Sequence, residues 1–203
     1  NKGGNGIYKP ANNNTQILPS QSGLLNAGCK SVASMASGRL IVSTQSNGGT
    51  WSTYNKGLNW SKLDNPGAHP YNQISFNTMT AQGDTVWGVG SNDTLYRIIG
   101  NATTWEKTID CNSWYTGETF VRIIDSVVYL VESEQIRRSF DRGATWEVLL
   151  TVTNNNDFRG IAKVGNYLFY STNDGIVFRS ADNGLTWENN YEIWSPGAHR
   201  LNA

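Results

Sequence analysis

Short apolar stretches alternate with turn-forming residues along most of the chain. Each stretch is rich in β-branched or aromatic residues and is bounded by Gly, Asn, Asp or Ser. This pattern is typical of β-strands, and no stretch has a convincing helical period. Eight such stretches stand in pairs split by a turn signal: 31–35 with 40–43, 74–79 with 85–89, 119–124 with 127–131, and 158–164 with 167–170. The chain is therefore predicted to be all-β.

An eleven-residue segment follows each pair and recurs at a nearly constant spacing. Its copies end at Trp60, Trp105, Trp146 and Trp187, and a first copy without the indole ends at Ile17. A period of about 40–50 residues indicates a repeat architecture, and an all-β repeat of this length fits one propeller blade. Each unit is predicted to have four antiparallel strands. The units end near residues 18, 63, 109, 150 and 194.

The two ends of the chain are complementary parts of such a unit. Residues 6–18 offer a third and a fourth strand, and residues 195–202 offer at most one inner strand. Propellers often close by sharing one blade between the termini. We therefore expect a single domain over residues 1–203, a β-propeller of about five four-stranded blades. The alternative is a fragment of a six- to seven-bladed propeller.

Two of the recurrent segments carry a complete five-point motif, Ser-x-Asp-x-Gly-x-Thr-Trp, and a third carries a relaxed version. The first copy has Ser139, Asp141, Gly143, Thr145 and Trp146; the second has Ser180, Asp182, Gly184, Thr186 and Trp187; the relaxed copy has Asn55, Gly57 and Trp60. The motif resembles the Asp-box, or bacterial neuraminidase repeat, of sialidase-like and sortilin-like β-propellers. This resemblance covers nearly the whole chain. It implies the fold but little about activity, because the family includes enzymes, sorting receptors, assembly factors and adhesins.

The chemistry of the motif favours a structural role. Asp or Asn shortly before Gly forms a tight turn, in which the side-chain oxygens accept backbone N–H bonds and Gly takes a positive φ. The Trp offers a large apolar face that pins the turn to its surroundings. In the family that the motif resembles, these turns lie away from the ligand-binding face. The motif residues are therefore predicted to stabilise the blades rather than to bind a ligand.

Composition and charge narrow the function classes. Sixteen basic and sixteen acidic side chains give a formal net charge of zero, and no basic stripe points to nucleic acid. No apolar run approaches the length of a membrane span. Cys29 and Cys111 fall at different repeat positions and are expected to be free thiols. No His or Cys stands at metal-ligand spacing and no nucleotide-binding fingerprint is present, so neither a metal nor another cofactor is expected.

The candidate binding residues lie in loops that connect successive blades, because that face of a propeller commonly binds ligands and loops carry function. The best loop runs from Asp110 through Trp114 and Tyr115 to Glu118. Trp and Tyr faces stack on sugar rings while acids accept hydroxyl protons, and aromatic residues are also common anchors of protein interfaces. The competing interpretation is that Trp114 only covers the edge of a blade.

Four further residues are weaker candidates. Trp194 and Tyr191 lie in the corresponding loop of the last unit, and His69 and His199 each end a Pro-Gly-Ala-His segment. The two histidines either line a pocket at one rim or belong to a shared turn made by Pro-Gly.

These features favour a non-catalytic recognition module that binds a glycan or a surface protein through its rim loops, such as an adhesin or a phage receptor-binding domain. Such a module would be extracellular, on a cell surface or on a virion, within a longer chain or an oligomer. The alternatives are a glycoside hydrolase of sialidase or endoglucanase type and an assembly scaffold. Against a sialidase, Arg97, Arg138 and Arg179 occupy one repeating position. The blade explains that position better than a cluster around a substrate carboxylate does.

Overall fold

The computed structural model describes residues 8–10, 17–19, 28–45, 48–64, 74–111, 119–151 and 158–192. For residues 8–10, 17–19 and 189–192 it describes the backbone. Every regular element in these ranges is a β-strand. The same ranges contain no helix that is long and apolar enough to cross a membrane.

The described ranges contain eighteen strands. They are β1 (Tyr8–Pro10), β2 (Ile17–Pro19), β3 (Cys29–Ser34), β4 (Leu40–Thr44), β5 (Thr50–Thr53), β6 (Ser61–Leu63), β7 (Phe76–Gln82), β8 (Thr85–Gly90), β9 (Thr94–Ile99), β10 (Glu106–Asp110), β11 (Phe120–Ile124), β12 (Val127–Val131), β13 (Gln135–Ser139), β14 (Glu147–Thr151), β15 (Phe158–Val164), β16 (Tyr167–Thr172), β17 (Ile176–Ser180) and β18 (Glu188–Glu192).

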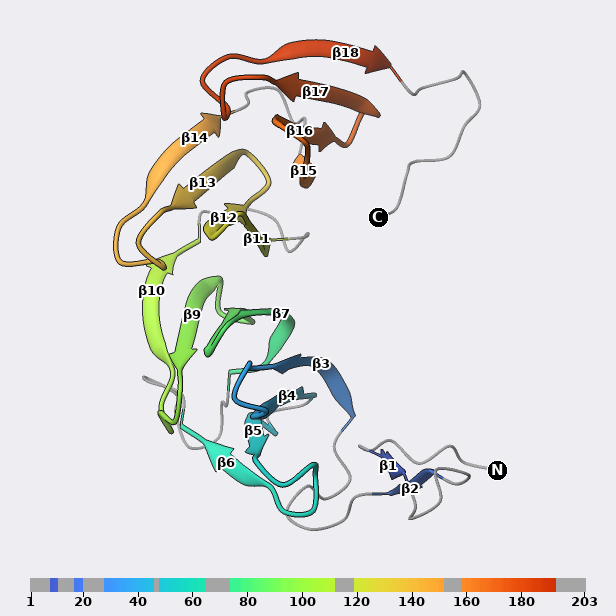
Figure 1. Cartoon of the computed structure of the whole chain (residues 1–203), viewed down its shortest axis with the longest axis vertical. Helices are drawn as coiled ribbons and strands as arrows, with labels where there is room; N and C mark the ends of the chain where they lie inside the picture. The colour runs from blue at the N-terminus through green and yellow to red at the C-terminus, as the bar shows by residue number, and fades with distance from the viewer. Residues whose placement is uncertain are drawn as a thin grey trace. The chain divides into compact units, whose positions relative to one another are not determined.

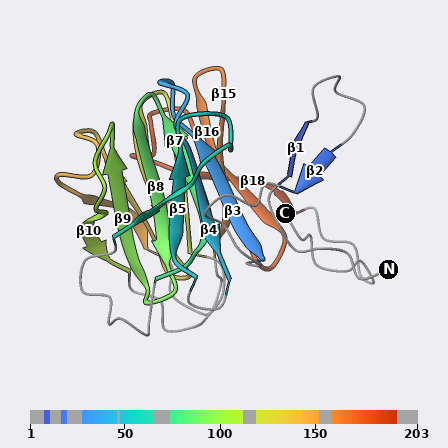
Figure 2. The ribbon, with the colours of Figure 1, turned by 90° about the horizontal axis from the view of Figure 1, so that it is seen from below.

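The strands form four four-stranded sheets and one two-stranded sheet, each in simple chain order (Figure 1). The four-stranded sheets are β3–β6, β7–β10, β11–β14 and β15–β18, and β1 pairs antiparallel with β2. Figure 2 shows β7 to β10 lying side by side. The prediction of an all-β fold built from four-stranded antiparallel blades is confirmed. Sharing of the first blade between the termini stays a prediction, because residues 193–203 lie outside the described ranges.

The chain divides into two compact units, Asn1–Ile109 and Asp110–Ala203, which we call unit 1 and unit 2. In unit 1, β3 and β4 contact β7. The core there is built around the fully buried Phe76, whose ring centroid lies 4.4 Å from that of Trp105 and 5.8 Å from that of Tyr96. Trp105 Nε1 donates to Thr50 Oγ1 over 2.9 Å, so the indole is both packed and hydrogen-bonded. Whether the two units form a single domain stays a prediction.

In unit 2, β11 and β12 contact β15. Tyr170 is the centre of the aromatic core there. Its ring stacks on Phe178 with centroids 4.6 Å apart and meets the rings of Phe158 and Trp187 edge-on. Burial and the nearby Asp174 carboxylate raise the pKa of Tyr170 to about 12.

Tight turns close the hairpins at one end of the sheets. Asp125 and Ser126 connect β11 and β12 with φ values of 48° and 69°, and Ile124 pairs with Val127 directly across the turn. Two consecutive positive φ values are typical of the type I′ turn, whose twist matches that of the flanking strands.

Candidate functional site

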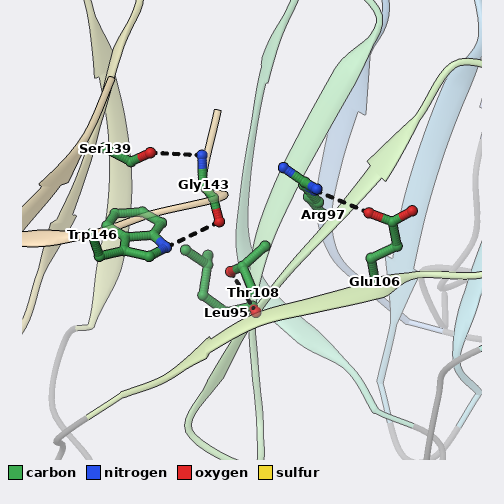
Figure 3. Close-up of polar contacts among 7 residues, drawn as sticks. All are labelled: Leu95, Arg97, Glu106, Thr108, Ser139, Gly143 and Trp146. Carbon is green, nitrogen blue, oxygen red and sulfur yellow. Dashed lines mark hydrogen bonds and ion pairs between the residues drawn. The ribbon is translucent and has the colours of Figure 1, made fainter. Parts of the chain in front are cut away.

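Three turns that connect the third and fourth strands of their sheets share one hydrogen-bonding scheme. We call residues 53–60, 139–146 and 180–187 the box turns. In the second of them Ser139 Oγ accepts a 2.7 Å bond from the backbone N–H of Gly143, while Trp146 Nε1 donates to the Gly143 carbonyl over 3.2 Å (Figure 3). The same hydroxyl donates to Asp141 Oδ1 over 2.8 Å. One Ser therefore links both sides of the turn.

The acidic residue of each complete box turn accepts bonds from the Thr four residues later. Asp182 Oδ1 accepts the backbone N–H of Thr186 at 2.9 Å, and Oδ2 accepts its hydroxyl at 2.6 Å. The bond from Ser180, followed by those from Thr186, holds the pKa of Asp182 well below its ordinary value. Thr145 and Ser139 lower the pKa of Asp141 to about 2 in the same way. Both carboxylates are thus held ionised by the turns that they stabilise.

The backbone of the box turns repeats as closely as their hydrogen bonds. The residue after the Asp or Asn has a φ of 58° in all three turns: Lys56, Arg142 and Asn183. The glycine that follows has a φ of 82° at Gly57, 85° at Gly143 and 91° at Gly184. A Cβ on Gly184 would also lie 2.6 Å from Leu149 Cδ1, so both φ and space require glycine there.

The copy that ends at Trp105 makes different contacts, because Gly100 stands where the other turns have Asp or Asn. The backbone N–H of Gly100 donates to the Asp84 carbonyl over 2.7 Å, and its own carbonyl accepts Arg39 Nη1 at 2.5 Å. This turn is therefore held by its neighbours rather than by its own side chains.

Most of the residues predicted to bind a ligand lie outside the described ranges. These are Trp114, Tyr115, Glu118, His69, His199 and Trp194. The expectation that Tyr191 lies in a loop is wrong: it lies in β18, paired with Val177 of β17, and the backbone alone is described there. Asp110 is described: it is the exposed last residue of β10.

Asp110 is held by a buried ion pair at the opposite end of unit 2 from the box turns. We call this the loop end of unit 2; it carries the 132–134 and 173–175 connections. Arg137 binds Glu132 through both carboxylate oxygens, with Nε and Nη2 each 2.6 Å from an oxygen. Arg137 Nη2 also donates to the Asp110 carbonyl over 2.9 Å. The Glu132 side chain is fully buried and that of Arg137 is 10% exposed. A bidentate pair of this kind fixes geometry as well as charge.

The sequence reasoning missed Glu132 and Arg137, although the repeat contains a signal. Arg137 stands nine residues before Trp146, where the other copies have Trp51, Tyr96 and Phe178. A charged residue in a position otherwise filled by aromatic side chains implies a buried partner. An arginine at this otherwise aromatic position therefore predicts a buried ion pair.

Further polar contacts hold the loop end. Arg159 Nη2 donates to Asn173 Oδ1 over 3.1 Å, and the Thr172 hydroxyl donates to Asp174. The backbone N–H of Phe158 donates to the Ser133 carbonyl over 3.1 Å. These bonds fix the backbone at this end of the unit 2 sheets.

The described residues include both cysteines and can be searched for metal-binding clusters. Cys29 and Cys111 are both free thiols, and burial raises the pKa of Cys29. Within the described ranges, no group of three or more His, Cys, Asp or Glu side chains could hold a metal ion.

The chain is similar to known proteins in structure, while no similar sequence was found. No family model and no curated protein sequence matches the chain. Streptogramin B lyase is similar in structure with a TM-score of 0.66 and 17% identity, over 96% of this chain and 64% of that one. The GH74 xyloglucanase from Xanthomonas campestris is similar with a TM-score of 0.57 and 21% identity, over 84% of this chain and 25% of that one.

A third similar structure is YCF48 bound to D1 peptide, with a TM-score of 0.56 and 14% identity over 83% of this chain. The match spans 56% of the YCF48 chain. All three are β-propeller-type proteins, and at these identities the likeness shows the fold alone.

Proposed function

We propose that the chain is a non-catalytic recognition module that binds its ligand at the loop end of unit 2. The observation that carries the proposal is the bond from Arg137 to the Asp110 carbonyl, because it anchors the start of the loop that contains Trp114 and Tyr115. The bond fixes the backbone at the end of β10, which lowers the entropy cost of binding through the residues that follow.

A glycan is the ligand that we favour. Trp114 and Tyr115 offer aromatic faces for sugar rings, and Asp110 and Glu118 offer carboxylates for hydroxyl groups. The likeness to a structure named as a GH74 xyloglucanase supports this choice. The box turns support a relationship to the Asp-box propellers, whose ligand face lies away from such turns.

A protein or peptide ligand is the second candidate. It is favoured by YCF48, a propeller-type protein whose structure was solved with a bound D1 peptide. In that case the chain would act as an assembly scaffold or as an adhesin for a surface protein. We further propose an extracellular, cell-surface or virion location, which suits an adhesin or a phage receptor-binding domain.

A glycan array combined with a set of chromogenic glycosides tests the proposal. We expect the array to select glycans whose binding at the loop end is lost in Trp114→Ala, without turnover of any glycoside. Tyr54→Ala is the matched control, because Tyr54 is a 55%-exposed aromatic residue on a box turn of unit 1. Turnover that disappears when one acid outside the box turns is replaced would instead establish a hydrolase. Peptide capture without glycan binding would favour the second candidate.

A further inference from the structure

Two hollows lie side by side among the box turns of unit 2, at the opposite end of its sheets from the proposed loop site. The larger has a volume of about 400 Å³ and is lined by residues that include Asp125, Lys163 and Leu185. The smaller has a volume of about 200 Å³ and is lined by residues that include Trp146. Arg138 and Phe140 line both hollows, so Phe140 stands between them. The larger volume falls within the range of about 300–1,000 Å³ that is typical of small-ligand sites.

Phe140 is exposed yet held in place. Its side chain is 64% exposed, which is unusual for a large apolar group beside a hollow. The Arg138 guanidinium lies 4.9 Å from the centre of the ring. Arg138 is itself fixed, because Nε donates to Glu147 over 2.5 Å and Nη1 donates to the Asn183 carbonyl over 2.6 Å. The ring is therefore a preorganised apolar platform in a polar surrounding.

Each charged side chain around the hollows has an ion-pair or hydrogen-bond partner of its own. Lys163 pairs with Asp125, and Arg138 pairs with Glu147. Asp141 and Asp182 accept bonds from their own box turns. These carboxylates keep lone pairs that can accept further hydrogen bonds, since each carboxylate has about four such sites.

The balance of these charges selects among ligand classes. Four carboxylates and two cations line the two hollows together, so an anionic ligand meets net repulsion. The same net charge attracts a cation, but Glu147 and Asp125 already pair with Arg138 and Lys163, and Arg138 occupies one face of Phe140. A neutral ligand that combines apolar ring faces with many hydroxyl groups fits both the platform and the acceptors.

The geometry points to a site for a neutral saccharide of about two rings, one in each hollow, with Phe140 as the platform between them. Leu185, which is 77% exposed, adds an apolar wall to the larger hollow, and Trp146 adds an aromatic wall to the smaller. This site does not rest on the proposed loop-end function, since it shares no residue with it.

Unit 1 contains a matched arrangement that serves as a control. Tyr54 occupies the box-turn position of Phe140, and the guanidinium of Arg39 lies 5.1 Å from the centre of its ring. The Tyr54 hydroxyl, however, donates to Asn101 Oδ1 over 3.2 Å. The two aromatic residues therefore share exposure and an arginine partner, but Tyr54 lines neither hollow.

Amide-resolved NMR titration of the full 203-residue chain tests the site. The probes are the neutral disaccharides cellobiose, maltose and lactose, the anionic 3′-sialyllactose and the cation choline. We expect at least one neutral disaccharide to shift the amides of Phe140, Asn183 and Leu185, while the two charged probes leave them in place. Phe140→Ala should weaken this binding about tenfold, the loss expected for one stacking ring.

Two controls and one alternative variant complete the test. Tyr54→Ala and Trp114→Ala should both leave unchanged the affinity measured at the Phe140, Asn183 and Leu185 amides, because neither Tyr54 nor Trp114 belongs to this site. If Phe140→Ala fails to fold, Leu185→Ser replaces it, because Leu185 is the most exposed of the apolar walls. The proposal is overturned if none of the neutral disaccharides shifts these amides. It is also overturned if a charged probe shifts them equally or if Tyr54→Ala weakens binding as much as Phe140→Ala.

Discussion

Arg137 of β13 binds Glu132, which directly follows β12, through two hydrogen bonds of 2.6 Å each, although the residue paired with Arg137 across the hairpin is Leu130. The pair is almost completely withdrawn from water, and the arginine reaches on to the Asp110 carbonyl. The buried guanidinium of Arg137 is tolerated because the Glu132 carboxylate is held within hydrogen-bonding distance of it. The hairpin thus supports both the blade and the start of the 110–118 loop.

Breaking the ion pair between Arg137 and Glu132 should destabilise the folded state strongly. We expect Glu132→Gln to lower the free energy of unfolding by about 3–5 kcal/mol, because it leaves the arginine buried without its counter-charge. Urea denaturation measures the change. The matched control is Glu106→Gln, which removes an exposed ion pair with Arg97 (Figure 3). That control should cost at most about 1 kcal/mol, since exposed pairs contribute little. Equal losses in the two variants would contradict a structural role for the buried pair.

Phe76 should be the most sensitive position of the unit 1 core. Truncation by Phe76→Ala removes ring contacts with Tyr96 and Trp105 and leaves a cavity, so we expect a loss of about 3–5 kcal/mol. Thermal and urea unfolding followed by tryptophan fluorescence would report it. Gly88→Ala acts on the same ring, because a Cβ there would lie 2.7 Å from Phe76 Cδ1, and it should destabilise the fold as well.

Acid should weaken the box turns of unit 2 within a defined pH window. The folded state lowers the pKa of Asp141 from 3.8 to about 2, and it also lowers that of Asp182. The unfolded state therefore binds protons first as the pH falls. The stabilisation is complete above about pH 4 and is lost as the pH falls through about 2.

The melting temperature, followed by circular dichroism between pH 6 and pH 2, tests this prediction. A variant with both Asp141→Asn and Asp182→Asn should fold, because Asn55 already occupies this position in the first box turn. Its melting temperature should be lower at neutral pH and should fall less steeply in acid. An acid dependence as steep as that of the parent chain would show that other groups control it.

Lys56 should be a position where stability can be gained. Its φ of 58° lies in the left-handed region, where Asn is tolerated better than Lys, and Asn183 occupies the same position in the third box turn. We expect Lys56→Asn to raise the stability by up to about 1 kcal/mol. Gly57→Ala, at a φ of 82°, should instead lower it by about 1 kcal/mol or more. A destabilising Lys56→Asn would show that the lysine side chain contributes more than its backbone strain costs.

The sequence by itself determined the strands and the turns of this protein. Alternating short stretches predicted β12 and β15 at their observed limits, because side-chain periodicity and turn residues act locally. The repeat spacing predicted four-stranded units, since each copy contains the same order of apolar stretches and turn residues. It also identified the residues of the box turns, whose hydrogen bonds join residues at most four positions apart.

The tertiary structure alone decided which side chains meet between neighbouring sheets. Arg138 reaches the Asn183 carbonyl 45 residues away, and Lys163 reaches Asp125 38 residues away. Such contacts depend on how two sheets pack and which rotamers that packing allows, and neither is encoded in a local pattern. The repeat explains Arg138 by its blade alone. Arg138 also lines two hollows, because the packing of the unit 2 sheets brings Asn183 next to it.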